Sequence, residues 1–222
     1  MKKPRAKRSL KKDKTLWIVD FDYTLYDVYR FMDDLGKILK KEFGVTLKTY
    51  KESKVILQSN NLYTFEGHMR AAKKIHPASS SLPYWQVIKR IEKLAKRSSQ
   101  YFFADAMPFM RSIAKDGEVI LLSHGHTLQQ KRKMKASGIE KYVDRIIIVP
   151  NKIEKAAWIK KLAKNRERTI IVNDDPEETL DIIALQPNVS KIFLVERRAG
   201  KYYPITPHKD YTVIKNLRNI RI

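Results

Sequence analysis

Short runs of apolar residues, most of them bounded by a polar or acidic residue, recur along the chain and predict the strands of a sheet. The runs lie at 16–20, 119–123, 146–149 and 169–173, with two weaker ones at 192–195 and 211–214. Segments of helical periodicity lie between most of them, at 106–116, 128–137 and 152–164. Strands that alternate with helices predict an α/β fold, with a Rossmann-like, mainly parallel sheet and helices on both faces.

The segment 26–104 interrupts this alternation. It is too long for a loop, and four stretches within it have helical periodicity, at 27–42, 48–58, 64–75 and 84–97. We therefore predict an all-helical cap domain at 26–104, inserted into a catalytic core that is formed by 15–25 and 105–222. A cap that follows the first strand would cover the carboxyl edge of the sheet, where it could close on a substrate and exclude water.

Polar side chains stand at the predicted carboxyl ends of three strands. Asp20 ends the first run, Ser123 the second, and Asp174 follows the fourth. Parallel sheets bind their ligands beyond these ends. The sequence therefore predicts a functional site that joins three segments far apart in the chain.

The sequence DFDYT at 20–24 places two carboxylates two residues apart. Asp20 can attack phosphorus as a nucleophile, and Asp22 can protonate the leaving oxygen and later activate water. A phosphoryl group brings its own negative charge, and Mg²⁺ is the usual hard cation beside it. Ser123 and His124, at the end of the second run, are candidates to bind the phosphate. Lys152 or Lys155, upstream of the fourth run, could neutralise developing charge.

Each of these residues also has a structural interpretation. Asp22 and Ser123 could serve only in turns, and TLQQ at 127–130 looks like a capping box that opens a helix. Asp175 is followed by Pro176 and Glu178, a pattern typical of an N-cap, a first helical residue and the end of a capping box. Asp175 is thus a helix cap, a metal ligand or both, and Asp174 is the first candidate for the metal.

The ordered set DFDYT, LLSHG, a lysine and VNDDPEE resembles the four motifs of the haloacid dehalogenase superfamily, and the resemblance runs from about residue 15 to the end of the chain. It implies a Rossmann-like core with a helical cap and hydrolysis through an aspartyl-phosphate. It also implies Mg²⁺ bound by Asp20, the Asp22 carbonyl and Asp174. By the same resemblance Ser123 and a lysine bind phosphate.

Lys152 is the first candidate for that lysine because it starts the helix before the fourth strand, and Lys155 is the second. Asp22 favours the phosphatase branch of the superfamily over the dehalogenase branch, which looks different at that position. Asn173 and Glu178 depart from the common pattern, which has a glycine and an aspartate there, so the metal geometry stays open.

The net charge of +22 is the chain's most unusual global property, and residues 1–14 alone contain eight Lys or Arg and one Asp. Such charge attracts phosphate-bearing polymers or acidic membranes, although a solvated terminus has the same composition. The chain has no cysteine, which excludes disulfides and thiolate metal sites. It has no apolar run near the ~20 residues that span a bilayer, and the cytoplasm is the default location.

These features together predict a Mg²⁺-dependent phosphomonoesterase for a small phosphate ester, such as a nucleotide or a sugar phosphate. Two alternatives remain open at this stage. One is a nucleic-acid-binding protein with the same fold and little or no catalysis, and the other is a phosphatase of nucleic-acid termini.

Overall fold

The structure of the protein is a computed structural model that describes residues 15–59, 64–75, 84–185, 187–197 and 202–222. The predicted basic segment 1–14 lies outside the described residues. In the described part of the chain, six strands form one sheet in the order β3-β2-β1-β4-β5-β6, and every neighbouring pair is parallel. The strands are β1 (Leu16–Val19), β2 (Glu118–His124), β3 (Arg145–Val149), β4 (Thr169–Asn173), β5 (Lys191–Val195) and β6 (Thr212–Ile214). This confirms the predicted parallel α/β fold.

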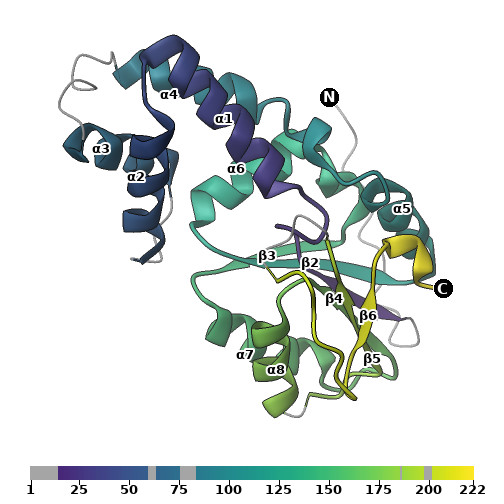
Figure 1. Cartoon of the computed structure of the whole chain (residues 1–222). Coiled ribbons are helices and arrows are strands. Elements are labelled where there is room, and N and C mark those ends of the chain that lie inside the picture. The colour runs from purple at the N-terminus through teal and green to yellow at the C-terminus, as the bar shows by residue number, and fades with distance from the viewer. Residues whose placement is uncertain (1–14, 60–63, 76–83, 186, 198–201) are drawn as a thin grey trace.

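Helices cover both faces of the sheet (Figure 1). The covering helices are α5 (Ala106–Asp116) and α6 (Thr127–Ser137) on one face, and α7 (Lys152–Ala163) and α8 (Pro176–Ala184) on the other. Side chains alternate between the two faces along each strand. Accordingly, Trp17 and Val19 belong to the apolar cluster that includes α5 and α6, and Leu16 and Ile18 belong to the cluster that includes α7 and α8. Burial on both faces explains why these strands appear in the sequence as unbroken apolar runs.

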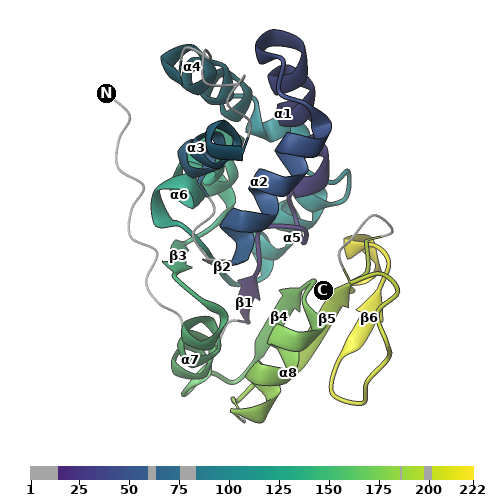
Figure 2. The same cartoon turned by 60° about the vertical axis from the view of Figure 1, so that its left-hand side comes forward.

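Four further helices pack together away from the sheet (Figures 1 and 2). They are α1 (Val28–Phe43), α2 (Leu47–Ser59), α3 (Phe65–Ile75) and α4 (Tyr84–Ala95). The chain enters and leaves this group through two segments that lie side by side. The Asp27 amide donates to the Tyr101 carbonyl at 2.7 Å, and the Phe103 amide donates to the Leu25 carbonyl at 3.0 Å. These helices, which we call the cap helices, lie in the segment for which the sequence predicts the cap.

Local signals set the ends of α1. The Asp27 side chain accepts from the Arg30 amide at 3.0 Å and so caps the first turn. Gly44 ends the helix in the left-handed conformation, with φ of 65°, which glycine adopts without a Cβ clash. None of the helices in the described part of the chain is long and apolar enough to cross a membrane.

His68 makes the stability of the cap helices sensitive to pH. Its side chain is buried between α2 and α3, where a ring nitrogen lies 3.0 Å from the Tyr50 carbonyl. Burial lowers the pKa of His68 from 6.5 to about 4. The unfolded chain therefore takes up a proton near pH 6.5 that the folded protein accepts only near pH 4. We expect the free energy of unfolding to be highest above pH 6.5 and to fall by up to about 3 kcal/mol on acidification to pH 4.

Urea unfolding of the wild type and of His68→Gln across pH 4–8 measures this effect. The difference between the two proteins should change through that window and be constant above it. Parallel curves would assign the whole pH dependence to other groups.

Candidate active site

The site lies at the carboxyl ends of three adjacent strands. β1 pairs with β2 on one side and with β4 on the other, and Val19 is in register with both Leu121 and Val172. Asp20 and Asp174 therefore leave the sheet at the same level. Crossovers run in opposite directions from β1 and β4, so the site occupies the switch point at which parallel sheets bind ligands.

The central contact of the site is an ion pair between Asp20 and Lys155. The Lys155 Nζ lies 2.7 Å from the Asp20 Oδ1 and 2.5 Å from the Glu178 Oε1, and the Lys155 side chain is only 3 % exposed. Burial opposes the charge of Lys155, but the two carboxylates outweigh it and raise its pKa. Lys155 is thus a buried, permanently charged ammonium group beside Asp20.

The two carboxylates respond differently to this environment. Burial raises the pKa of Asp20 to about 6, with Lys155 opposing the shift and Glu178 adding to it. Burial also acts to raise the pKa of Glu178, but there Lys155 prevails and holds it at about 2. Glu178 therefore compensates the lysine charge as a stable anion, whereas Asp20 takes up a proton more readily.

Lys152, the first candidate for the phosphate-binding lysine, lies elsewhere. Its Nζ is 2.5 Å from the Asp175 Oδ2 and 3.7 Å from the Glu177 Oε2, and its side chain is 31 % exposed. The structure brings the second candidate, Lys155, to Asp20 instead. The two lysines are three residues apart on α7, so a sequence reading of the helix start cannot separate them.

Asp174 and Asp175 have different surroundings. The Asp174 carboxylate is buried and accepts from the Thr24 hydroxyl at 3.1 Å. Burial, reinforced by the charge of Asp20, raises the pKa of Asp174. Asp175 caps α8 as predicted, because its Oδ1 accepts from the Glu178 amide at 3.0 Å, and its Oδ2 accepts from the Tyr202 hydroxyl. Both oxygens of Asp175 thus have protein donors, and Asp174 is the better placed of the two for a metal.

Glu178 does not complete the predicted capping box. Its carboxylate points to the site, where it contacts Lys155, the Asn173 Nδ2 at 2.9 Å and the His124 Nδ1 at 3.2 Å. The reason is electrostatic, since a buried ammonium attracts a carboxylate more strongly than a backbone amide does. The two residues that depart from the superfamily pattern, Asn173 and Glu178, are therefore partners of each other.

The Asp22 carboxylate is held by two residues that the sequence did not assign to the site. The Lys133 Nζ lies 2.6 and 2.7 Å from its two oxygens. The Gln130 Nε2 donates to the Asp22 Oδ2 at 2.7 Å and also contacts the Ser123 Oγ at 3.3 Å. Gln130 thus joins the first motif to the second.

The capping box predicted at 127–130 is also wrong. Thr127 is the first helical residue, the N-cap His126 makes no side-chain cap bond, and the Gln130 side chain turns to the site. Gly125 permits this arrangement. Its φ of 132° favours glycine, and a Cβ there would lie 3.3 Å from the Gln130 Nε2.

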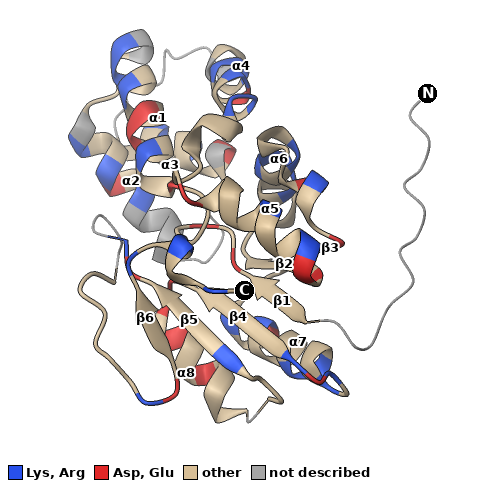
Figure 3. Ribbon diagram, turned by 90° about the vertical axis from the view of Figure 1, so that its right-hand side faces the viewer, with Lys and Arg blue, Asp and Glu red and all other residues tan. Residues whose placement is uncertain are grey.

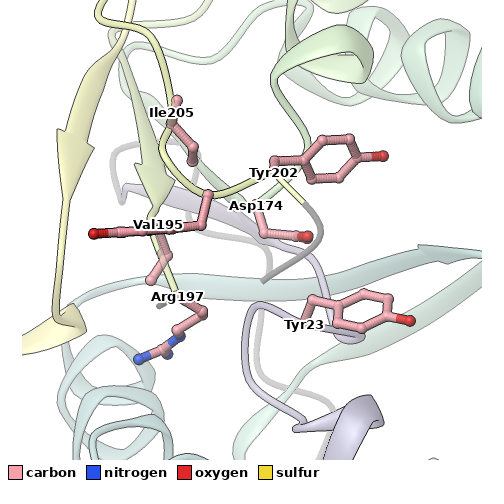
Figure 4. A pocket seen from close by; sticks show the side chains of 7 residues that line it. Tyr23, Asp174, Val195, Arg197, Tyr202 and Ile205 are labelled. Carbon is pink, nitrogen blue, oxygen red and sulfur yellow. The ribbon is translucent and has the colours of Figure 1, made fainter. Parts of the chain in front are cut away.

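A small cavity adjoins Asp174 (Figure 4). Its volume of about 10 Å³ suits one water-sized group. The rings of Tyr23 and Tyr202 line it together with Asp174. Tyr23 has a φ of 61°, which is unusual for a side chain of its size. Strained backbone of this kind clusters at functional sites, where the surrounding structure enforces it.

The oxygen donors of the site suit a magnesium ion. Among the described residues, no group of three or more acidic or histidine side chains is arranged around one point. Magnesium needs fewer, because it commonly uses one or two carboxylates and keeps several waters. Asp20 and Asp174 supply two buried carboxylates. Burial is the main cause that raises the pKa of each, and the charges of neighbouring carboxylates add to it. A divalent cation would relieve that repulsion.

No protein-family model matches the chain, and no curated protein matches it. Solved structures do. A haloacid dehalogenase-like hydrolase assigned in Burkholderia xenovorans has a TM-score of 0.72 at 18 % identity, covering 92 % of this chain and 93 % of that chain. YfnB from Bacillus subtilis, a HAD-hydrolase bound to magnesium, has a TM-score of 0.58 at 12 % identity, covering 94 % and 97 %.

The L-2-haloacid dehalogenase of Xanthobacter autotrophicus has a TM-score of 0.57 at 14 % identity, covering 91 % and 94 %. The same fold is therefore found in proteins described as hydrolases and in a haloacid dehalogenase. What these proteins share with the chain is the fold. The chain has the fold of the haloacid dehalogenase-like hydrolases, as the motif resemblance implied.

Proposed function

We propose that the chain is a magnesium-dependent phosphomonoesterase that works through an aspartyl-phosphate on Asp20. The observation that carries the proposal is the buried Lys155–Asp20 ion pair at the switch point of the sheet, with Asp22 two residues away. A cation fixed beside a carboxylate suits attack on an anionic phosphoryl group, because it offsets the charge that two anions bring together. The hydrolase fold supports the same reaction class.

In the proposed reaction, an Asp20 oxygen attacks phosphorus and the ester P–O bond breaks. Asp22 donates a proton to the leaving oxygen. Asp22 then takes a proton from water, whose oxygen attacks the phosphorus of the acyl phosphate and restores the Asp20 carboxylate. Lys155 holds positive charge at Asp20 throughout, and the Ser123 hydroxyl donates to a phosphoryl oxygen. Lys133 and Gln130 orient Asp22 between the two steps.

We propose that Asp20, Asp174 and the Asp22 carbonyl hold the magnesium ion. When bound there, the ion would neutralise phosphoryl charge that Lys155 alone does not offset.

We propose a small phosphate ester as substrate, such as a nucleotide or a sugar phosphate, because cap helices lie next to the site. Glu66 of α3 accepts from the Gln129 Nε2 at 2.9 Å, and it pairs with Arg132 at 3.3 Å. Gln129 and Arg132 both belong to α6, the helix whose Gln130 and Lys133 contact the Asp22 carboxylate.

Removal of magnesium tests the metal proposal. We expect hydrolysis of p-nitrophenyl phosphate with added Mg²⁺, loss of that activity in EDTA, and its return when Mg²⁺ is restored. Asp174→Ala should lose the response to Mg²⁺ together with activity, whereas Asp181→Ala on the outer part of α8 should keep both. Equal rates with and without the metal would contradict the metal proposal.

The dehalogenase reaction needs a separate assay, because one of the proteins with this fold is an L-2-haloacid dehalogenase. We expect no halide release from a 2-haloalkanoic acid, since Asp22 supplies a proton donor that an ester leaving group needs. Halide release without phosphate release would refute the phosphatase proposal.

A further inference from the structure

One face of α4 is strongly basic. The helix and the turn that continues it carry five basic residues within 89–97, and the side chains of all five are exposed. They are Lys89, Arg90, Lys93, Lys96 and Arg97. Their spacings of three and four residues place them on a common side. Glu92 is the one acidic residue of the same stretch. Figure 3 shows blue stretches along this helix, which lies at the outer end of the cap helices. We call these five residues the α4 basic face.

An exposed aromatic ring adjoins the α4 basic face. Trp85 precedes Lys89 by one helical turn and is 59 % exposed. The Lys89 Nζ lies 4.9 Å from the centroid of the ring, over one of its sides. Trp85 therefore lies outside the buried apolar side of α4, which contains Ile91 and Leu94, and leaves most of its ring open on a highly charged surface.

The α4 basic face also borders a groove between α1 and α4. Ile38 and Leu94 line it together with Arg90, Lys93 and Arg97, and its volume is about 180 Å³. No carboxylate belongs to the described residues that line it. Among the described residues, no ion pair to an acidic side chain involves Lys93 or Arg97 within 4.0 Å. The groove is therefore concave, apolar at its base and positive at its rim.

We infer that the α4 basic face, with Trp85, is a binding surface for single-stranded nucleic acid. Lysine and arginine side chains follow a phosphate backbone, and an exposed aromatic ring stacks on an unpaired base, which is the combination that single strands require. A duplex would offer Trp85 no open base. The inference concerns a surface away from Asp20 and does not depend on catalysis there.

A membrane surface is the less suitable partner. Helices that bind in the plane of a bilayer expose an apolar face opposite their basic one. The apolar face of α4 packs against the other cap helices. Among the described side chains of α4, Trp85 is the one large apolar side chain that is exposed. One ring gives little membrane affinity, whereas one stacked base already adds measurably to the binding of a single strand.

Fluorescence anisotropy of a labelled oligothymidylate of about 15 nucleotides tests the inference on the full chain at low salt. We expect Lys93→Glu/Arg97→Glu to weaken binding by about tenfold or more and to reduce its salt dependence. Trp85→Ala should weaken it by roughly fivefold or more through lost stacking.

The matched control is Lys160→Glu/Lys164→Glu, which makes the same change in charge on exposed residues at the far side of the sheet (Figure 1). We expect it to bind almost as the wild type does. Circular dichroism and thermal unfolding establish that each variant is folded. Equal losses in the two double variants would reduce the effect to net charge and overturn the inference. So would unchanged binding in Lys93→Glu/Arg97→Glu, or binding to anionic vesicles in the absence of oligonucleotide binding.

Discussion

Replacing Asp20 by asparagine is expected to lower the turnover of p-nitrophenyl phosphate by a factor on the order of 10⁴ or more. An amide cannot attack phosphorus to form an acyl phosphate, so the reaction loses its first step. The protein should stay folded, because Lys155 keeps its second partner, Glu178, at 2.5 Å. Burial also raises the pKa of Asp20, so the site gains little free energy from its charge.

Asp22→Asn is the matched comparison. It removes a proton donor but leaves the nucleophile, so we expect a smaller loss, of about 10²- to 10⁴-fold. Denatured protein quenched during turnover should carry acid-stable, base-labile phosphate in the wild type and none in Asp20→Asn. Turnover in Asp20→Asn close to that of the wild type would refute the aspartyl-phosphate mechanism, whatever the behaviour of Asp22→Asn.

The sheet and the positions of the site motifs could be predicted from the sequence because both depend on local patterns. The central strands are buried on both faces, so their apolar runs are continuous and end where the chain reaches the site. The order of the motifs then fixes which side chains leave the sheet together. Asp20, Ser123 and Asp174 follow from these two facts, since parallel strands share one carboxyl edge.

The partners of these residues could not be predicted, because they depend on how helices are rotated against the sheet. Lys133 lies 111 residues after Asp22 in the sequence, and in a chain with 46 lysines and arginines nothing distinguishes it. Gln130 and Glu178 matched capping boxes locally. The Gln130 side chain turns instead to the half-buried Asp22 carboxylate, and the Glu178 side chain turns to the buried Lys155 ammonium. A local motif thus gave way to the stronger requirement that buried charges be paired.

The sequence could not decide between Lys152 and Lys155 for the same reason, because the answer depends on how α7 is rotated against the sheet. Both lie in the first turn of α7, and only the helix rotation decides which one is buried. On that helix the Lys155 side chain is 3 % exposed, whereas the side chain of Lys152, the first helical residue, is 31 % exposed. Burial, and not position relative to the strand, therefore identifies the lysine that meets Asp20.

Exchange of the two lysines for methionine measures this difference directly. Lys155→Met leaves the buried carboxylates of Asp20 and Glu178 without a counter-charge, and we expect the free energy of unfolding at pH 7.5 to fall by about 3 kcal/mol or more. Lys152→Met removes a partly exposed ion pair to Asp175 and should change it by about 1 kcal/mol or less.

Activity should separate the two variants as well. We expect Lys155→Met to lose turnover by about 10²- to 10³-fold, because one preorganised cation at developing charge is worth that much, and Lys152→Met to keep most of it. The loss of stability in Lys155→Met should shrink at pH 5, where Asp20, with a pKa raised to about 6 even beside the lysine, can take a proton and shed its unpaired charge. A larger loss of turnover in Lys152→Met than in Lys155→Met would contradict this expectation. It would identify Lys152, the first candidate from the sequence, as the phosphate-binding lysine.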